Sequence, residues 1–318
     1  MLTRRGLLSA GAGLAAASLT SARPSFAQQP APSLGPNRLV TLGTRGGPAI
    51  RTGFTPSPSG NLIVFDSVPY VIDTGYGVSA KLVESKFALP QLRYVFITHH
   101  HSDHNAEFGL LAYNAWAMGL KTPVDGYGPI GMKRLAQGFW DAYAFDIETR
   151  MADEGRPDLR KLVTAHEYTE GEVLKTDKVR VSALRNVHPP IVESFALKFE
   201  FPGKTVVFSG DTAYHPPLAA FAKGADILVH EAMLLPAIEF IVRANPNAAT
   251  MLKHLKESHT PVADVGRIAA DAAVKTLVLS HYVPVDAPNV TDQQWIDGVR
   301  ETWKGELVLA KDLMEVKL

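Results

Sequence analysis

The chain contains no cysteine among its 318 residues. This excludes disulfides, thiolate metal ligands and a cysteine nucleophile, so any bound metal must be held by nitrogen and oxygen. The formal net charge is zero, which gives no electrostatic reason to expect a nucleic acid or an acidic surface as a partner. Long apolar runs are also lacking. The run at residues 7–19 has about 13 apolar residues, whereas a helix needs roughly 20 to cross a bilayer.

The first residues have the features of an export signal. Arg4 and Arg5 precede the apolar run, and the small residues Ser25 and Ala27 occupy the positions that a signal peptidase recognises. The paired arginines resemble a twin-arginine signal, the route that exports folded proteins. We therefore predict a signal peptide at residues 1–27, a mature chain over 28–318, and a periplasmic or secreted protein without stable membrane insertion. The alternative is an N-terminal membrane anchor or a core helix.

Beyond residue 37 the sequence predicts an α/β chain. Short runs rich in β-forming residues alternate with helical patterns, and Gly, Pro and Asp separate them. The helical pattern is clearest at residues 105–118, 131–154 and 261–273. The predicted strands form two sets, at 38–42, 62–65, 70–72 and 93–98, and then at 179–184, 194–199, 205–208, 227–230 and 276–279. The sequence thus predicts two strand-rich halves with helices between them.

Four of the eleven histidines lie in one stretch, residues 97–105, ITHHHSDHN. The stretch follows a predicted strand, and residues two apart in extended backbone point the same way, so His99 and His101 share one side. Asp103 and His104 come where the chain turns into a helix and project in another direction. Neutral imidazole and carboxylate are ligands that suit zinc, and two neighbouring ions can share a water. The pattern His-x-His-x-Asp-His favours a metal site over a loop of solvated histidines.

Three more residues of ligand type follow predicted strands. His188 comes after residues 179–184, Asp211 after 205–208, and His281 after 276–279. Each alone could be a buried polar group that is satisfied by hydrogen bonds. Together with the histidine-rich stretch, they favour one site at the edge of a sheet.

The order of these motifs resembles the metallo-β-lactamase superfamily of hydrolases, over nearly the whole mature chain. The matching segments are Leu42-Gly43-Thr44, Val71-Ile72-Asp73-Thr74-Gly75, Thr98 to His104, His188, Gly210-Asp211-Thr212 and Ser280-His281. The resemblance implies an αββα sandwich, with two sheets back to back and helices outside, and two zinc ions at one edge. By position, one ion would be held by His99, His101 and His188, the other by Asp103, His104 and His281, with Asp211 bridging them. Zinc is implied over iron because di-iron relatives usually carry Glu where His101 stands.

Two further segments look like the ribonuclease Z and arylsulfatase branch of that superfamily. They are Leu228-Val229-His230-Glu231-Ala232 and Ser258-His259-Thr260. The resemblance implies that His259, oriented by Glu231, donates a proton to the leaving group while a metal-bridging hydroxide attacks. Asp103 then counts among the catalytic residues as well as the ligands. The alternative for this pair is structural, as a helix cap and a strand-end carboxylate. Arg45, in a Gly-rich loop, is a candidate for binding an anionic substrate, or else a surface arginine.

The expected reaction is metal-dependent hydrolysis of an ester bond, and the expected substrate is a small sulfate or phosphate ester with an aryl group. Nucleic acid is not expected, given the zero net charge and the lack of a long Gly-rich basic arm. The alternatives are a lactone- or β-lactam-opening hydrolase, a ribonuclease Z-like endonuclease, and a non-catalytic metal-binding protein. Either the aromatic segment 115–162 or the segment 234–255 could cover the site. His254 has no motif context and is expected to be solvated.

Overall fold

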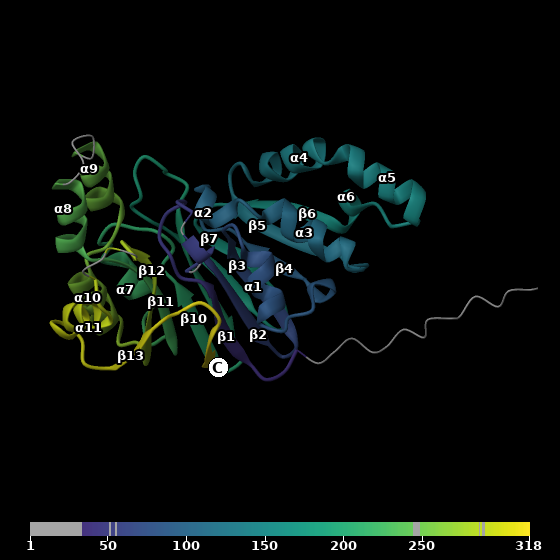
Figure 1. The fold of residues 1–318 in the computed structure, drawn as a ribbon. Helices are drawn as coiled ribbons and strands as arrows, with labels where there is room; N and C mark the ends of the chain where they lie inside the picture. The colour runs from purple at the N-terminus through teal and green to yellow at the C-terminus, as the bar shows by residue number, and fades with distance from the viewer. Residues whose placement is uncertain (1–33, 51, 55, 244–248, 286, 288–289) are drawn as a thin grey trace, which may run out of the picture. The chain divides into compact units, whose positions relative to one another are not determined.

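A computed structural model describes residues 34–318 except 51, 55, 244–248, 286 and 288–289. The predicted signal peptide lies outside these residues, so export stays a prediction. The described chain forms two seven-stranded sheets (Figure 1). The first sheet has the order β14 (Met314–Lys317), β1 (Arg38–Gly43), β2 (Gly60–Phe65), β3 (Val68–Thr74), β4 (Tyr94–Phe96), β5 (Val124–Pro129) and β6 (Val163–Tyr168). The second has the order β13 (Glu306–Leu309), β12 (Thr276–Val283), β11 (Ile227–Met233), β10 (Lys204–Phe208), β9 (Phe195–Phe201), β8 (Arg180–Arg185) and β7 (Gly171–Lys175).

The central strands are apolar on both faces because both faces are covered. In β2, Ile63 belongs to a core of side chains drawn from both sheets, while Leu62 and Val64 belong to a core shared with helices. Aromatic rings fill much of the layer between the sheets. Phe199 is fully buried there and meets the ring of Phe96 edge to face, with centroids 5.1 Å apart. Side chains alternate between the two faces of each strand, so one face of each sheet packs on the other sheet and the outer face packs on helices. This is the αββα sandwich that the sequence predicted.

Helices cover the outer face of each sheet (Figure 1). On the first sheet these include α1 (Val78–Glu84), α3 (Phe108–Ala117), α4 (Met132–Ala142), α5 (Ala144–Glu154) and α6 (Leu159–Leu162). On the second they include α7 (Pro217–Phe221), α10 (Val262–Ala272) and α11 (Asp292–Arg300). The remaining helices are α2 (Ser102–Asn105), α8 (Leu235–Arg243), α9 (Ala249–Ser258) and the short 3-10 turns η1 (Thr52–Phe54) and η2 (Leu89–Gln91). No helix among the described residues is long and apolar enough to cross a membrane.

One predicted helix is divided in the structure, and another begins later than predicted. The prediction over 131–154 becomes α4 and α5, which meet at Tyr143, where the backbone turns to φ −104° and ψ 8°. The ring of Tyr143 stacks on that of Phe139 at 4.1 Å, and the turn lets Ile147 of α5 be buried in the core. The helix predicted over 105–118 is α3, which begins at Phe108, and the short helix α2 precedes it. Between them Glu107 accepts a hydrogen bond from the backbone nitrogen of Ser79 at the start of α1. The third helix, predicted at 261–273, is α10.

The layer between the sheets generates a prediction about stability. Phe199→Ala should lower the free energy of unfolding by about 3–5 kcal/mol, because it leaves a cavity among several buried rings. Phe145→Ala is the matched control, since that ring is 85% exposed. It should change the free energy by no more than about 0.5 kcal/mol. Denaturant unfolding of both variants measures this, and equal effects would show that the inter-sheet rings do not dominate the core.

Candidate metal centre

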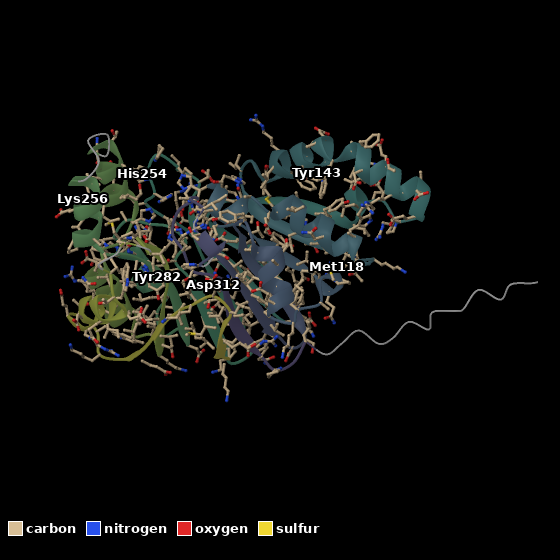
Figure 2. The ribbon with its side chains drawn as sticks, viewed as in Figure 1. Met118, Tyr143, His254, Lys256, Tyr282 and Asp312 are labelled. Carbon is tan, nitrogen blue, oxygen red and sulfur yellow. The ribbon has the colours of Figure 1, made fainter. Side chains whose placement is uncertain are left out.

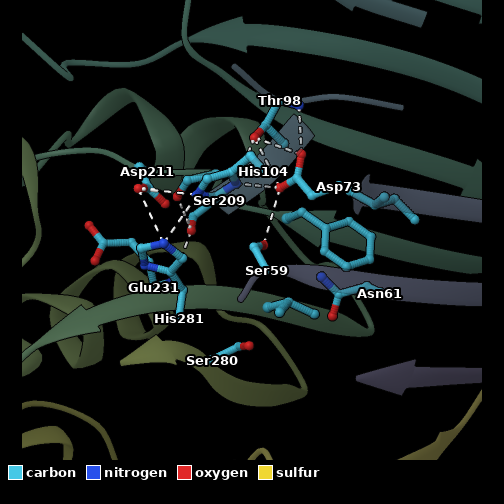
Figure 3. Close-up of a pocket in the computed structure, with 14 residues that line it drawn as sticks. Ser59, Asn61, Asp73, Thr98, His104, Ser209, Asp211, Glu231, Ser280 and His281 are labelled. Atoms are coloured by element: carbon cyan, nitrogen blue, oxygen red, sulfur yellow. Dashed lines mark hydrogen bonds and ion pairs between the residues drawn. The ribbon is translucent and has the colours of Figure 1, made fainter. Parts of the chain in front are cut away.

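The candidate site is built on a carboxylate at the end of β3. Asp73 has a positive φ of 61° and is almost fully buried. It accepts hydrogen bonds from the backbone nitrogen of Thr98 at 2.8 Å and from the Thr98 hydroxyl at 3.0 Å. His104 Nδ1 donates to the same carboxylate at 2.8 Å, and Ser59 lies on its other side (Figure 3). Asp73 therefore fixes both the start of the histidine-rich loop and the ring of one predicted ligand.

Three imidazole nitrogens converge where β4 and β8 end. His99 Nε2 lies 3.0 Å from His101 Nδ1, and His188 Nε2 lies 3.1 Å from the same atom. The opposite nitrogen of two of these rings has a partner. His188 Nδ1 donates to the carbonyl oxygen of Ser258 at 2.9 Å, and His99 Nδ1 lies 3.1 Å from the Thr98 hydroxyl. Such outer hydrogen bonds fix the tautomer and ring orientation of a metal ligand.

A second group of ligand atoms lies beside the first. His104 Nε2 and His281 Nε2 are 3.1 Å apart, and Asp103 Oδ2 lies 3.6 Å and 3.4 Å from them respectively. Asp211 Oδ2 lies 3.4 Å from His104 Nε2 and 3.3 Å from His281 Nε2. The same oxygen is also 3.8 Å from His99 Nε2 in the first group. Asp211 thus lies close to histidines of both groups, and Figure 3 shows it beside His104 and His281 of the second.

The first group is neutral at pH 7. Burial lowers the pKa of His99 well below its usual value, and His104 lowers it further. Burial also lowers the pKa of His101, to about 4, and that of His188. The three rings therefore hold free lone pairs, which is the form in which imidazole binds a metal.

The carboxylates of Asp103 and Asp211 are anionic. Burial by itself raises the pKa of Asp103 and of Asp211, but the adjacent His104 and His281 lower both below their usual range. Among the described residues, every ion pair of these two carboxylates is with a histidine. Buried anionic groups without a lysine or arginine partner suit a bound cation.

The residues fit a metal on two further observations. Asp211 Oδ1 is buried and has no hydrogen-bond partner among the described residues, so one oxygen of the shared carboxylate remains available. The nitrogen separations of 3.0 Å and 3.1 Å are close to the roughly 3.3 Å expected between two imidazole ligands of one tetrahedral zinc ion. All seven residues that the sequence predicted as ligands are present in these two groups: His99, His101, His188 and Asp211 in one, and Asp103, His104 and His281 in the other.

The predicted acid–base pair lies beside the ligands. His259 Nδ1 is 3.2 Å from Glu231 Oε2, and both side chains are buried. Glu231 Oε1 also accepts from the backbone nitrogen of Thr260 at 2.8 Å, which holds the carboxylate in place. Burial lowers the pKa of His259, but Glu231 outweighs this and raises it to about 9. The His259 ring stacks on that of His281 at 5.8 Å, so the pair faces the metal ligands.

A cavity of about 380 Å³ opens onto this centre. His101, Asp103, Asp211, His259 and His281 line one side of it. The rest of the lining comes from Gly46 to Pro48 after β1, Ser102 of α2, Met251, His254 and Leu255 of α9, and Val283 of β12.

The cavity wall comes from the second of the two segments that the sequence offered as a cover. His254 lies on α9, whereas Tyr143 lies with α4 and α5 in another part of the chain (Figure 2). Trp116 and Trp140 of the first segment are buried in the core beneath the first sheet. His254 had no motif context, and the structure places its partly buried side chain in the lining of the cavity. A helical face cannot be assigned to a site before the fold is known.

Arg45 is placed differently from the other candidates. Its side chain is buried, its guanidinium lies 5.4 Å from the centre of the Tyr76 ring, and Nη2 donates to the Tyr76 hydroxyl. Arg45 is not among the residues that line the cavity, although its neighbours Gly46 and Gly47 are. A part for Arg45 in binding an anionic substrate stays a prediction.

Comparison with known proteins places this centre in a family. The profile described as "Beta-lactamase superfamily domain" matches residues 68–282, which include all seven ligand residues. Ribonuclease Z of Mycobacterium marinum is 29% identical over 252 residues, covering 78% of this chain and 88% of that protein. The putative ribonuclease Z of Mycobacterium tuberculosis is 28% identical over 227 residues, covering 70% of this chain and 98% of that protein. The chain belongs to the metallo-β-lactamase superfamily and is a metal-dependent hydrolase of ester bonds in its ribonuclease Z-like branch.

Solved structures share the fold at lower identity. The metallo-β-lactamase fold protein YhfI from Bacillus subtilis has a TM-score of 0.65 at 20% identity, covering 89% of this chain and 100% of that one. The short form of human tRNase Z has a TM-score of 0.63 at 20% identity, covering 88% of this chain and 98% of that one. These likenesses confirm the sandwich.

The expectation of a small-molecule ester as partner, and of no nucleic acid, is wrong. The relatives that align with most of this chain are ribonucleases, whose substrate is a nucleic acid. The expectation relied on the zero net charge of the whole chain. Net charge averages over the entire surface, whereas a scissile phosphate is recognised by the few groups that surround it.

The position of Asp73 generates a prediction about metal affinity. Asp73→Asn should weaken metal binding about 10–100-fold, since the amide no longer accepts a charge-assisted hydrogen bond from His104. Asp125→Asn is the matched control, because Asp125 pairs with His166 at 3.0 Å on the same sheet but outside the site. Competition with a fluorescent chelator measures affinity, and thermal unfolding verifies that both variants are folded. Equal affinities in the two variants would show that Asp73 has no part in holding the ligand.

Proposed function

We propose that the chain hydrolyses phosphodiester bonds in RNA with two zinc ions, using Glu231 and His259 to protonate the leaving oxygen. The observation that carries the proposal is the buried Glu231–His259 pair beside the two groups of ligands. The ribonuclease Z relatives favour this function over the sulfate or phosphate ester of an aryl group that the sequence favoured.

The chemistry of the leaving group supports the same choice. An aryl ester releases a weakly basic phenolate, which departs with little help. An RNA diester releases a ribose hydroxyl, and such a strongly basic oxygen needs a proton donor. An imidazole held by a buried carboxylate is more useful to the second reaction than to the first.

Two zinc ions are proposed from the number and kind of ligands. Seven histidine and aspartate side chains exceed what one tetrahedral ion uses. They fall into two groups, and Asp211 lies within 4 Å of histidine nitrogens of both. His99, His101 and His188 would hold one ion, and Asp103, His104 and His281 the other. When bound, the ions would activate a water as the nucleophile and offset the charge that gathers on the phosphoryl oxygens.

The chain's own residues then carry the proton. Glu231 accepts a hydrogen bond from His259 Nδ1, which leaves His259 Nε2 to face the cavity. As the bond from phosphorus to the new oxygen forms and the bond to the ribose oxygen breaks, the Nε2 proton passes to the ribose oxygen. The proton lost by the attacking water restores the ring by way of solvent.

The proposal predicts a zinc-dependent ribonuclease. The purified chain should contain close to two zinc ions and should cleave a stem-loop RNA with a single-stranded 3′ tail, leaving a 3′-hydroxyl and a 5′-phosphate. Chelation should abolish cleavage, and added zinc should restore it. Asp211→Ala should lose more metal than any other single ligand variant, because Asp211 serves both groups. Elemental analysis and gel-resolved products measure this. A chain that is loaded with metal and hydrolyses bis(p-nitrophenyl) phosphate but no RNA would contradict the proposal.

The acid–base pair gives a separate prediction. His259→Ala should keep both metals and lower the turnover of RNA about 10²–10⁴-fold, the usual contribution of a positioned acid. On bis(p-nitrophenyl) phosphate the loss should be much smaller, since nitrophenolate leaves without a proton. Glu231→Gln should reproduce part of the effect, and the double variant should be little worse than His259→Ala alone.

Metal content and rates on both substrates are measured for each variant. Loss of a metal from His259→Ala would make that residue a ligand. Equal rate losses on the two substrates would exclude proton donation to the leaving oxygen.

A further inference from the structure

One face of α9 forms part of the cavity wall. Met251, His254 and Leu255 line the cavity, and Ser258 closes the helix one turn later. Their spacing of three, four and seven residues places them on the same side of the helix. His254 is the polar group of this face. Its ring centre lies 6.5 Å from that of His101, 6.3 Å from that of His188 and 6.5 Å from that of His259.

The hydrogen bonds of Ser258 determine which nitrogen of His254 carries the proton. The Ser258 hydroxyl donates to the carbonyl oxygen of Pro189 at 2.8 Å, which uses its one hydrogen. His254 Nδ1 lies 3.3 Å from the same hydroxyl oxygen and must therefore donate to it. In the neutral ring this leaves Nε2 as an acceptor, and no hydrogen bond to Nε2 is found among the described residues. On the α9 side of the cavity, His254 thus offers a substrate one side-chain acceptor between the apolar Met251 and Leu255.

We propose that His254 Nε2 accepts a hydrogen bond from the 2′-hydroxyl of the ribose next to the scissile phosphate, an inference that rests on the proposed function. The 2′-oxygen is joined to phosphorus through C2′, C3′ and O3′, so it stays close to a phosphate held at the metal ligands. The 2′-hydroxyl is also the donor that distinguishes RNA from DNA. His254 is therefore a specificity residue.

The rest of the wall suits a sugar. Pro48, Met251, Leu255 and Val283 line the same cavity and offer apolar contact to the carbon face of a ribose or to a base. None of the described residues that line the cavity is a lysine or an arginine, so a second phosphate finds no cationic partner there. A sugar with one hydroxyl donor matches this wall better than another charged group.

The test replaces the donor on the substrate. The probe is the stem-loop RNA described above, compared with the same oligonucleotide carrying 2′-fluoro sugars throughout its 3′ tail. Fluorine has nearly the size of the hydroxyl and cannot donate. Wild-type kcat/KM should fall roughly three- to tenfold on the fluoro tail, as expected for the loss of one neutral hydrogen bond. His254→Ala should lose a similar factor on RNA and lose nothing further on the fluoro tail.

Two conservative variants separate a substrate contact from a structural role. His254→Gln places an oxygen or nitrogen near the position of Nε2 and should keep the preference for ribose. His254→Asn reaches only as far as Nδ1, so it can keep the contact with Ser258 but not the contact with substrate, and it should lose the preference. His166→Ala is the matched control, because His166 pairs with Asp125 outside the cavity. All variants should retain their metals, and the control His166→Ala should also retain its rate on bis(p-nitrophenyl) phosphate.

Each outcome of these measurements either supports or overturns the contact between His254 and the 2′-hydroxyl. If His254→Gln keeps the preference for the ribose tail while His254→Asn and His254→Ala lose it, the contact between His254 and the 2′-hydroxyl is supported. If His254→Asn keeps the preference for the ribose tail and His254→Gln loses it, His254 is a structural partner of Ser258, and the contact with the 2′-hydroxyl is overturned. Equal rates of wild type on the ribose and fluoro tails overturn the contact but leave the ribonuclease function standing. Hydrolysis of bis(p-nitrophenyl) phosphate without any RNA cleavage overturns the proposed function, and the ribose contact with it.

Discussion

The buried carboxylate of Asp73 is the constraint on which the candidate site depends. It accepts hydrogen bonds from Thr98 at the end of β4 and from His104 on α2, and it lies beside Ser59 of the neighbouring loop. A buried carboxylate left without these partners would be strongly unfavourable, so the histidine-rich loop has little freedom to move away. Its positive φ of 61° is tolerated because the surrounding partners determine the conformation. The ligand positions therefore follow from the packing of β3 against β4.

The two sheets contribute different parts of the centre. The first sheet supplies the local stretch His99 to His104, whose members are close in sequence and positioned by Asp73. The second supplies His188, Asp211 and His281 from the ends of β8, β10 and β12, which the inter-sheet core brings to the same edge. Asp211 lies within 4 Å of histidine nitrogens from both sheets. Stability of the sandwich and affinity for metal are thus coupled through the aromatic layer between the sheets.

Features that depend on a local sequence pattern could be predicted from the sequence, whereas features that depend on packing could not. The ligand set could be predicted because its members belong to one local histidine-rich motif or lie close to the end of an apolar strand. Strand β5 could not be, since its sequence, VDGYGP, contains two glycines and a proline. Those glycines are explained only by the fold. A Cβ on Gly126 would come within 2.6 Å of the Phe108 ring, and one on Gly128 within 2.7 Å of the Met132 sulfur. The roles of Asp73 and His254 were missed because they depend on partners distant in sequence.

The segment that carries His254 lies between Glu231 and His259 in the sequence, yet these two side chains remain in contact. Glu231 lies on β11 before α8 and α9, and His259 comes directly after them. Both ends of the insertion are fixed by backbone hydrogen bonds, from Met233 nitrogen to Thr260 oxygen at 2.8 Å and from Leu234 nitrogen to Val283 oxygen at 2.8 Å. Leu252 and Leu255 pack on Met233, so the helices rest on the strand that they follow. Because these backbone hydrogen bonds do not involve the side chains of α9, the cavity wall can change in sequence while His259 keeps its place. In the proposed function, proton transfer by Glu231 and His259 and substrate selection by α9 would therefore belong to separate elements of the chain.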